Sequence, residues 1–442
     1  MEDTNVVFAV AVACLVAVTS TLVYFIRYLS SKPCENSQPE KNGVANKDPI
    51  GESKTIPQPK KKNVFEHKKI SKSNFSHPWL SKSLKAHTGN VLDADMSSSG
   101  KYFATASEDR SIILWATSDF STKNNTHNKG RVEFDHALRV CWSPDSKALV
   151  TYKAAANCVE VYKLTKSAEG KFSGFEVVVT FPVLHESGEI AGMGIDINGR
   201  YIMTCSTDNE LVIWTLKGEV LHRMNTNMGS THAAVLSPCG RFVTVCGFTP
   251  DVKVMEVVFS KTGSFEKVNR SFDLKGHTSG VFHVSTNTDS TKMATVSKDN
   301  SWKMFDTKID YGKGQEPSLL FSIAFDTRGE KALIALSPDG RSVAIASSTD
   351  VFFYSGVTGK FVKKIEHVHE EPITFLVFDP SNKFLLSGGD KQVRVFHNVV
   401  GYLATIEDLE QKKRTASHTA MRDRIADQIA EAQKFLASLG EC

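Results

Sequence analysis

The stretch Ala86–Asp109 reads AHTGNVLDADMSSSGKYFATASED, and Trp115 follows six residues after its last aspartate. His87 stands just before a strand-like segment, and a glycine-containing turn links that segment to a second one that ends at Ser107. A four-stranded unit of this size cannot bury its own apolar faces, so it is stable only when stacked against copies of itself. The stretch therefore predicts a repeat protein.

Further copies of the pattern occur at regular intervals. Each has a histidine, then an aspartate 21 to 23 residues later, then an aromatic residue six residues further on. The recurring histidines are His87, His185, His277 and His369. Their separations of 98, 92 and 92 residues correspond to about two repeats each, so a degenerate copy is expected in every gap. His136, Ser237–Arg241 and Ser337–Arg341 mark these copies, which gives seven repeats.

Repeats with these residues at these offsets resemble the WD-repeat family. The resemblance covers about residues 80–400 and implies an all-β, seven-bladed β-propeller, which we expect over residues 77–400. The motif is specific in the first and third repeats, partial in the fifth and seventh, and mostly lost in the others. A strand at Ser81–Lys85 is expected to pair with the last blade and close the ring, because an open ring would expose unpaired backbone donors.

The offsets that recur between the repeats suggest a network of polar side chains, here called a fastener, in each blade that has the full pattern. The histidine can bond a serine of the second strand and the aspartate of the following turn, and the tryptophan indole N–H can donate to the same serine, since buried polar groups need partners. The predicted fastener residues are His87, Ser107, Asp109, Trp115, His185, Ser206, Asp208, Trp214, His277, Ser297, Asp299, His369 and Asp390. Phe305 and Phe396 replace the tryptophan in two blades, where we expect a smaller network.

The amino terminus predicts a membrane anchor. After a short acidic segment, residues 1–5, Val6–Ile26 contains no charged residue, and this length spans a bilayer core of about 30 Å as a helix. We place the anchor at residues 6–28. A signal peptide would begin with basic rather than acidic residues, and a buried core helix is not expected ahead of a polar linker. Arg27 and Lys32 follow the segment and no basic residue precedes it, so the carboxyl side should face the cytosol.

Residues 29–76 have the composition of a disordered linker. Although the whole chain has a net charge of only +4, the linker contains a cluster of lysines, namely Lys60, Lys61, Lys62, Lys68, Lys69 and Lys72. The simplest interpretation is a solvated tether. The alternatives are a contact with anionic lipid headgroups, or with RNA on a ribosome surface.

The carboxyl-terminal segment, residues 401–442, changes to a helical period. Apolar residues at positions Ile425, Ile429, Ala432, Leu436 and Leu439 predict an amphipathic helix of about 18–20 residues. It either docks against the propeller or binds a partner.

The sequence contains no nucleotide-binding, zinc-protease or nucleophile-elbow motif. His367, His369, Glu370 and Glu371 lie close enough in sequence to suggest a zinc site, but His369 is already the histidine of the seventh repeat. We therefore expect no enzymatic activity, metal, cofactor or small-molecule substrate.

Within the WD-repeat family, the order of acidic amino terminus, membrane segment, lysine-rich tether and carboxyl-terminal helix resembles a membrane-anchored member. This resemblance implies a single-pass protein of the endoplasmic reticulum membrane with its propeller in the cytosol. It also implies a non-catalytic role connected with the stress-sensing kinase of that membrane, the unfolded protein response and translation under stress. Two hypotheses remain: a scaffold that binds protein partners through the propeller, and an RNA- or ribosome-binding protein that acts through the lysine cluster.

Overall fold

The computed structural model describes residues 75–166, 172–182, 188–415 and 418–441. The chain divides into two compact units, Met1–Ser71 and Lys72–Cys442, and all of the described residues belong to the second. The expected anchor at residues 6–28 and the lysine cluster of the linker lie outside the described residues.

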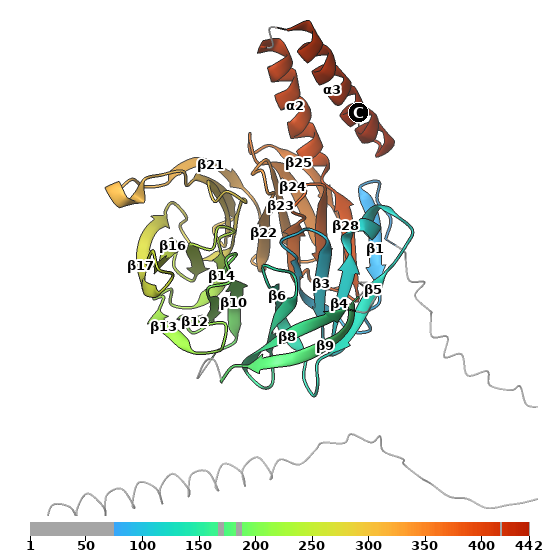
Figure 1. The fold of residues 1–442 in the computed structure, drawn as a ribbon. Coiled ribbons are helices and arrows are strands. Elements are labelled where there is room, and N and C mark those ends of the chain that lie inside the picture. Colours follow the sequence, from blue (N-terminus) through green and yellow to red (C-terminus); the bar gives the residue numbers. More distant parts are fainter. Residues whose placement is uncertain (1–74, 167–171, 183–187, 416–417, 442) are drawn as a thin grey trace, which may run out of the picture. The chain divides into compact units, whose positions relative to one another are not determined.

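The second unit is a β-propeller of seven four-stranded antiparallel sheets (Figure 1). Blades one to three comprise β2 (Val91–Met96), β3 (Tyr102–Ser107), β4 (Ser111–Ala116) and β5 (His127–Arg131); β6 (Ala137–Trp142), β7 (Ala148–Lys153), β8 (Cys158–Lys166) and β9 (Phe172–Thr180); and β10 (Ile190–Ile195), β11 (Ile202–Ser206), β12 (Glu210–Trp214) and β13 (Val220–Asn225). Blades four to six comprise β14 (Thr231–Leu236), β15 (Phe242–Gly247), β16 (Val252–Phe259) and β17 (Phe265–Leu274); β18 (Val281–Thr286), β19 (Lys292–Ser297), β20 (Ser301–Asp306) and β21 (Ser318–Ala324); and β22 (Ala332–Leu336), β23 (Ser342–Ser347), β24 (Asp350–Ser355) and β25 (Phe361–Ile365). Short 3₁₀ helices, η1 (Thr117–Ser121) and η2 (Tyr311–Lys313), lie in two of the connections.

Blade seven closes the ring. It contains β26 (Phe375–Phe378), β27 (Phe384–Gly388) and β28 (Gln392–His397), and its fourth strand is β1 (Leu80–Lys85) from the start of the propeller. β1 pairs antiparallel with β28, so that Leu84 lies opposite Val393. The seven-bladed propeller and the closing strand predicted from the sequence are both confirmed.

The apolar cores lie between neighbouring blades. One such core joins Ala104 and Leu114 of blade one to Trp142, Leu149 and Tyr162 of blade two. Since each blade completes its core with residues of its neighbour, a single blade has no buried core of its own. This sharing explains why the repeated sequence pattern implies a closed ring.

The alternating strand directions give the propeller two faces. The turns that join first to second strands and third to fourth strands share one face, and the chain enters this face at Phe75, just before β1; we call it the entry face. The connections between blades and the turns from second to third strands share the opposite face. We call it the fastener face, because His87 and Asp109 lie there.

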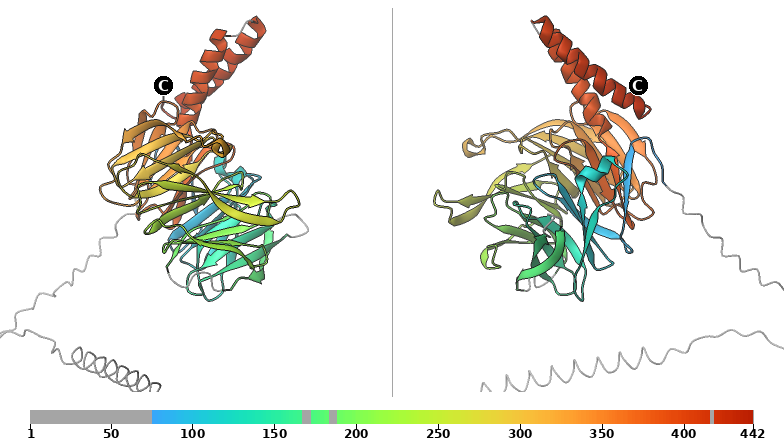
Figure 2. Two further views of the ribbon diagram at one scale, coloured as in Figure 1. Left: turned by 90° about the vertical axis from the view of Figure 1, so that its left-hand side faces the viewer. Right: turned by 45° about the vertical axis from the view of Figure 1, so that its right-hand side comes forward.

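Two helices follow blade seven, where the sequence pattern suggested one amphipathic helix. α2 (Val399–Thr415) leaves the propeller from the entry face, and α3 (Thr419–Ser438) folds back along it (Figures 1 and 2). Ile425, Ile429 and Leu436 of α3 belong to the same core as Trp79 of the propeller. The tail therefore docks on the propeller.

Polar contacts of Glu441, the last described residue, hold the end of the tail on the propeller. The Nε1 of the fully buried Trp79 donates a 2.9 Å hydrogen bond to Oε1 of Glu441, and Lys363 of blade six forms an ion pair with the same carboxylate.

None of the helices in the described part of the chain has the length and apolar character of a membrane span.

Candidate interaction faces

The fastener of blade one is a continuous chain of hydrogen bonds. Nε1 of Trp115 donates to Oγ1 of Thr105 at 3.0 Å, and this hydroxyl lies 2.7 Å from Nε2 of His87. Nδ1 of His87 lies 3.3 Å from both carboxylate oxygens of Asp109. Because a carboxylate only accepts, Nδ1 carries the proton, and Nε2 accepts from the Thr105 hydroxyl. With a neutral imidazole, the Trp115 indole, the Thr105 hydroxyl and both ring nitrogens of His87 each have a hydrogen-bond partner in this network.

The second-strand hydroxyl is thus Thr105, and the predicted Ser107 has another role. Ser107 Oγ accepts the backbone N–H of Asp109 at 3.2 Å and so shapes the turn. Ser297 of blade five caps its own turn in the same way, by accepting the N–H of Asp299 at 3.1 Å. Thr105 and Ser107 lie two residues apart and therefore point to the same face of the second strand. Ser107 is the last residue of its strand, where its hydroxyl reaches the turn, so the hydroxyl that contacts the histidine is the one two residues earlier.

Blade five repeats the arrangement without the tryptophan. His277 Nε2 lies 2.8 Å from Thr295 Oγ1, and its Nδ1 lies 2.8 Å from Asp299. The aromatic position holds Phe305, which is buried and has no donor to offer the threonine. The network is therefore shorter by one hydrogen bond, as expected from the sequence.

Blade seven adds a buried cation. His369 Nε2 lies 2.9 Å from Ser387 Oγ, and its Nδ1 lies 3.1 Å from Asp390. Nη1 of Arg394 donates to Asp390 at 2.9 Å, and the guanidinium lies 5.2 Å from the ring centre of Phe75. Arg394 occupies the third-strand position that Ile113 holds in blade one. This ion pair could not be read from the fastener pattern.

Blade three differs from the predicted fastener. Nε1 of Trp214 donates to Oγ1 of Thr204 at 2.9 Å, as Trp115 does to Thr105 in blade one. Ser206 accepts the N–H of Glu210 at 3.2 Å, and the carboxylate of Asp208 is exposed rather than buried. Its expected partner, His185, lies outside the described residues.

Burial keeps the fastener histidines neutral. Burial lowers the pKa of His87 to about 4, and it lowers the pKa of His277 and His369 as well, against the opposing effect of the neighbouring aspartates. Burial alone would raise the pKa of Asp109, but hydrogen bonds from Ser111 and from the N–H of Thr88 outweigh it, so the pKa of Asp109 is well below its usual range. The fastener therefore pairs an ionised carboxylate with a neutral ring.

The inner strands are tied together by carboxylates in blade one. Asp93 Oδ2 accepts the N–H of Val140 at 2.9 Å, and Asp95 Oδ2 accepts the N–H of Trp142 at 2.7 Å. Burial raises the pKa of Asp95 to about 7 despite these hydrogen bonds. These two residues link β2 to β6, and the histidine-based repeat pattern did not point to them.

Blades two, four and six have no histidine at the fastener position. In blades one, five and seven the histidine precedes its hydroxyl partner by 18 residues. The corresponding second-strand positions of blades two, four and six are Thr151, Val245 and Ile345. The residues 18 positions before them are Glu133, Asn227 and Thr327, so none is a histidine. His136, which marked the second repeat in the sequence, is half-exposed beside Asp135 at 3.6 Å.

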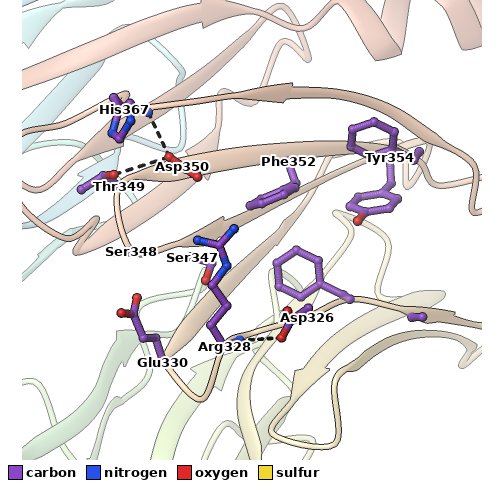
Figure 3. Close-up of a pocket in the computed structure, with 13 residues that line it drawn as sticks. Asp326, Arg328, Glu330, Ser347, Ser348, Thr349, Asp350, Phe352, Tyr354 and His367 are labelled. Carbon is purple, nitrogen blue, oxygen red and sulfur yellow. Dashed lines mark hydrogen bonds between the residues drawn. The ribbon is translucent and has the colours of Figure 1, made fainter.

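In blade six the missing fastener leaves a groove. A cavity of about 420 Å³ lies between the connection that contains Asp326 and Arg328 and the turn at Ser348 (Figure 3). Alternate residues of β24, Asp350, Phe352 and Tyr354, line one wall. His367 lies at one end, where its backbone N–H donates to Asp350 at 2.9 Å. His367 and His369 thus have separate roles, and the described residues contain no cluster of ligands suited to a metal ion.

The mouth of the central channel on the entry face is a second hollow. A cavity of about 620 Å³ is lined by inner-strand residues and turns from all seven blades. Partly exposed apolar side chains gather there, among them Met193, Ile195, Leu236 and Leu376, and Ile197 on the rim is 43% exposed. An apolar concavity of this size is a frequent site of protein or ligand contact.

The fold and its fasteners define a WD-repeat β-propeller. Residues 79–116, 268–306 and 359–397 match the family described as WD domain, G-beta repeat. These segments include the fasteners of blades one, five and seven.

Curated relatives narrow the assignment. The chain is 41% identical to human Transducin beta-like protein 2 over 399 residues, which cover 90% of this chain and 89% of that protein. It is also 41% identical to the mouse protein of the same name over 373 residues, 84% of each chain. Protein hir1 of Schizosaccharomyces pombe is 28% identical over 211 residues, 44% of this chain and 22% of that protein. The chain therefore belongs to the transducin beta-like protein 2 family of WD-repeat proteins, as its sequence pattern suggested.

Proposed function

We propose that the protein is a non-catalytic scaffold of the endoplasmic reticulum membrane whose cytosolic propeller binds protein partners. The apolar mouth of the central channel carries this proposal. Met193, Ile195 and Leu236 line this cavity and remain partly exposed. Apolar surface that is exposed to water in one concavity raises the free energy of the unbound protein. A partner that covers this surface removes that cost on binding.

The membrane location rests on the sequence. The uncharged run Val6–Ile26 supports a single anchor, and the basic residues that follow it support a cytosolic propeller. The resemblance of the chain to the transducin beta-like protein 2 family supports the endoplasmic reticulum as the compartment. It also supports the stress-sensing kinase of that membrane as a partner, with a role in the unfolded protein response and in translation under stress.

Proximity labelling in cells tests location and partner together. The full chain is expected to label proteins of the endoplasmic reticulum surface, including the kinase, and a variant that lacks residues 6–28 is expected to lose this pattern. Labelling of lumenal proteins by a propeller-fused enzyme would refute the proposed orientation.

A matched pair of substitutions tests the channel mouth. Ile197→Glu places a charge on the rim of the cavity, and Leu216→Glu places the same charge on the same blade and face but outside the cavity. The two side chains are similarly exposed, at 43% and 41%. We expect Ile197→Glu alone to remove the labelled partners while both variants fold. Equal labelling by the two variants would show that partners do not use the mouth.

A second candidate function rests on the lysine cluster. Lys60, Lys61, Lys62, Lys68, Lys69 and Lys72 would contact RNA phosphates in an RNA- or ribosome-binding protein. Crosslinking to RNA should then fall steeply as salt rises. Replacement of these lysines by glutamate without loss of crosslinking would exclude this function.

A further inference from the structure

Phe134 is exposed in a strained backbone conformation. Its side chain is 94% exposed, and its φ angle is 58°. This left-handed conformation is unfavourable for a bulky residue, and an aromatic ring in water adds a second cost. The neighbouring residues fix the conformation: Val132 is fully buried, and Asp135 accepts the N–H groups of Ala155 and Ala156 at 3.0 Å each. The ring is therefore held outward by the connection that carries it.

Phe248 is held outward in a similar way. Its side chain is 72% exposed in the turn between β15 and β16. The N–H of Phe248 donates to Ser230 at 2.9 Å, and the N–H of Thr249 donates to Met228 at 3.2 Å. These bonds tie the turn to the preceding connection, so the backbone that carries the ring is fixed before any partner binds. A rigid, exposed aromatic residue loses little entropy on binding and is typical of an interface anchor.

Both phenylalanines lie on the fastener face, and this face is acidic. Its described connections and turns contain fourteen Asp or Glu and six Lys or Arg residues, a net charge of −8. Without the three fastener carboxylates, whose side chains are buried (Asp109, Asp299 and Asp390), the net charge is still −5. The described connections and turns of the entry face contain nine acidic and twelve basic residues, a net charge of +3. The two faces therefore present opposite charge to a partner.

The unusual features coincide with the blades that lack a fastener. Phe134 lies in the connection to blade two, Phe248 in the turn of blade four, and the aromatic groove at Phe352 in blade six. In blades one, five and seven the corresponding loops are bound to each other through a buried histidine and aspartate. In blades two and four the corresponding loops are joined by other hydrogen bonds, and they carry exposed aromatic side chains.

We propose that the fastener face binds a basic protein surface with apolar pockets, which Phe134 and Phe248 enter while the surrounding carboxylates pair with lysine or arginine. This inference goes beyond the proposed function, because it assigns a second surface of opposite charge to the channel mouth. The carboxylates disfavour RNA on this face, since phosphates would meet like charge.

Peptide binding tests the proposed chemistry. The full chain in nanodiscs of zwitterionic lipid is titrated with a labelled peptide in which lysines alternate with leucines. A matched peptide with serines in place of the leucines and a single-stranded RNA are titrated in parallel. We expect the lysine–leucine peptide to bind more tightly than either by at least about tenfold, as anchor residues typically contribute, and to weaken as salt rises.

Three variants locate the binding. Phe134→Asn with Phe248→Ser, and separately Glu370→Lys with Glu371→Lys, are each expected to weaken the peptide by at least about tenfold. Asparagine tolerates the left-handed conformation, so the first variant should melt no lower than the unaltered chain. Ile197→Glu at the channel mouth should leave peptide binding unchanged, which separates this proposal from the proposed function.

The opposite results would overturn the inference. Equal binding of the leucine and serine peptides would show that the phenylalanines are not anchors. Unchanged binding by both fastener-face variants, or tighter binding of RNA than of the peptide, would show that this face has another role.

Discussion

The substitution Thr105→Val removes one hydroxyl and keeps the shape of the side chain. In blade one this hydroxyl accepts the Trp115 indole N–H at 3.0 Å and lies 2.7 Å from Nε2 of His87. The valine leaves two buried polar groups without partners. Each such group costs about 1–3 kcal/mol, so the free energy of opening blade one should fall by about 2–6 kcal/mol. Thr295→Val in blade five leaves only Nε2 of His277 without a hydrogen-bond partner, so it should lower the free energy of opening that blade by about 1–3 kcal/mol.

Native-state hydrogen exchange of the full chain measures this cost locally. A ring of blades does not have to unfold in a single step, so a global melting curve would not isolate one blade. Amides of β3 and β4 should exchange at least about 30-fold faster in Thr105→Val, because about 1.4 kcal/mol corresponds to tenfold. Amides of β19 and β20 should change less in Thr295→Val.

Ser107→Ala is the control that could refute this reasoning. Ser107 is equally buried but makes only the turn bond to the N–H of Asp109, so its loss should cost about 1 kcal/mol. If Thr105→Val accelerated exchange no more than Ser107→Ala, the hydrogen-bond chain from Trp115 to Asp109 would not stabilise the blade.

Three further outcomes follow from single contacts. The folded pKa of His87, about 4, lies below its ordinary value of 6.5, so the unfolded chain takes up the proton first. The stability of blade one should therefore fall as the pH drops from about 7 to 5, and less so in His87→Asn, as measured by hydrogen exchange in β3 and β4 with each variant compared at the same pH. Gly192→Ala should lower the melting temperature strongly, since a Cβ there would lie 2.0 Å from the backbone oxygen of Ala234, whereas Gly199→Ala, with open space around it, should cost only about 1 kcal/mol of backbone strain. Glu441→Ala should speed hydrogen exchange in α3, because the loss of the acceptor of Trp79 costs about 1–3 kcal/mol.

The ring could be predicted from the sequence because its repeats share a spacing. The offsets from His87 to Asp109 and Trp115 recur, and a unit too small to fold alone requires neighbours. The closing strand was predictable for the same reason, since a propeller needs a partner for β28. Regular features follow from composition and period, and these are present in every copy.

The identity of the bonding hydroxyl was harder to predict. Both Thr105 and Ser107 lie in β3 and both are fully buried, so composition does not separate them. The two side chains also point to the same side of the strand, so only their positions along it, which depend on the register with the inner strand, decide which one contacts His87. The tail shows a similar limit: the period indicated a helix, but the turn between α2 and α3 and the bond from Trp79 to Glu441 depend on tertiary contacts.

Charge on the two faces also required the fold. The net charge of +4 for the whole chain conceals a fastener face at −8, because residues far apart in sequence, such as Glu108 and Glu371, meet on one face only after the strands alternate. The exposure of Phe134 could not be anticipated either, since a phenylalanine next to a strand is normally buried.

The uneven distribution of fasteners is consistent with a division of roles among the blades. Blades seven and one flank the point where the ring closes, where the N–H of Val91 donates to Asp390 at 3.0 Å across a sequence separation of nearly the whole propeller. Closure of so long a loop is entropically costly, and rigid loops in both flanking blades reduce the chance that the junction opens. Blade five lies away from this junction and has a fastener too, so ring closure accounts only for the fasteners of blades seven and one. Blades two, four and six are not part of the junction, and a partner that binds their loops would contact the propeller without loosening its closure.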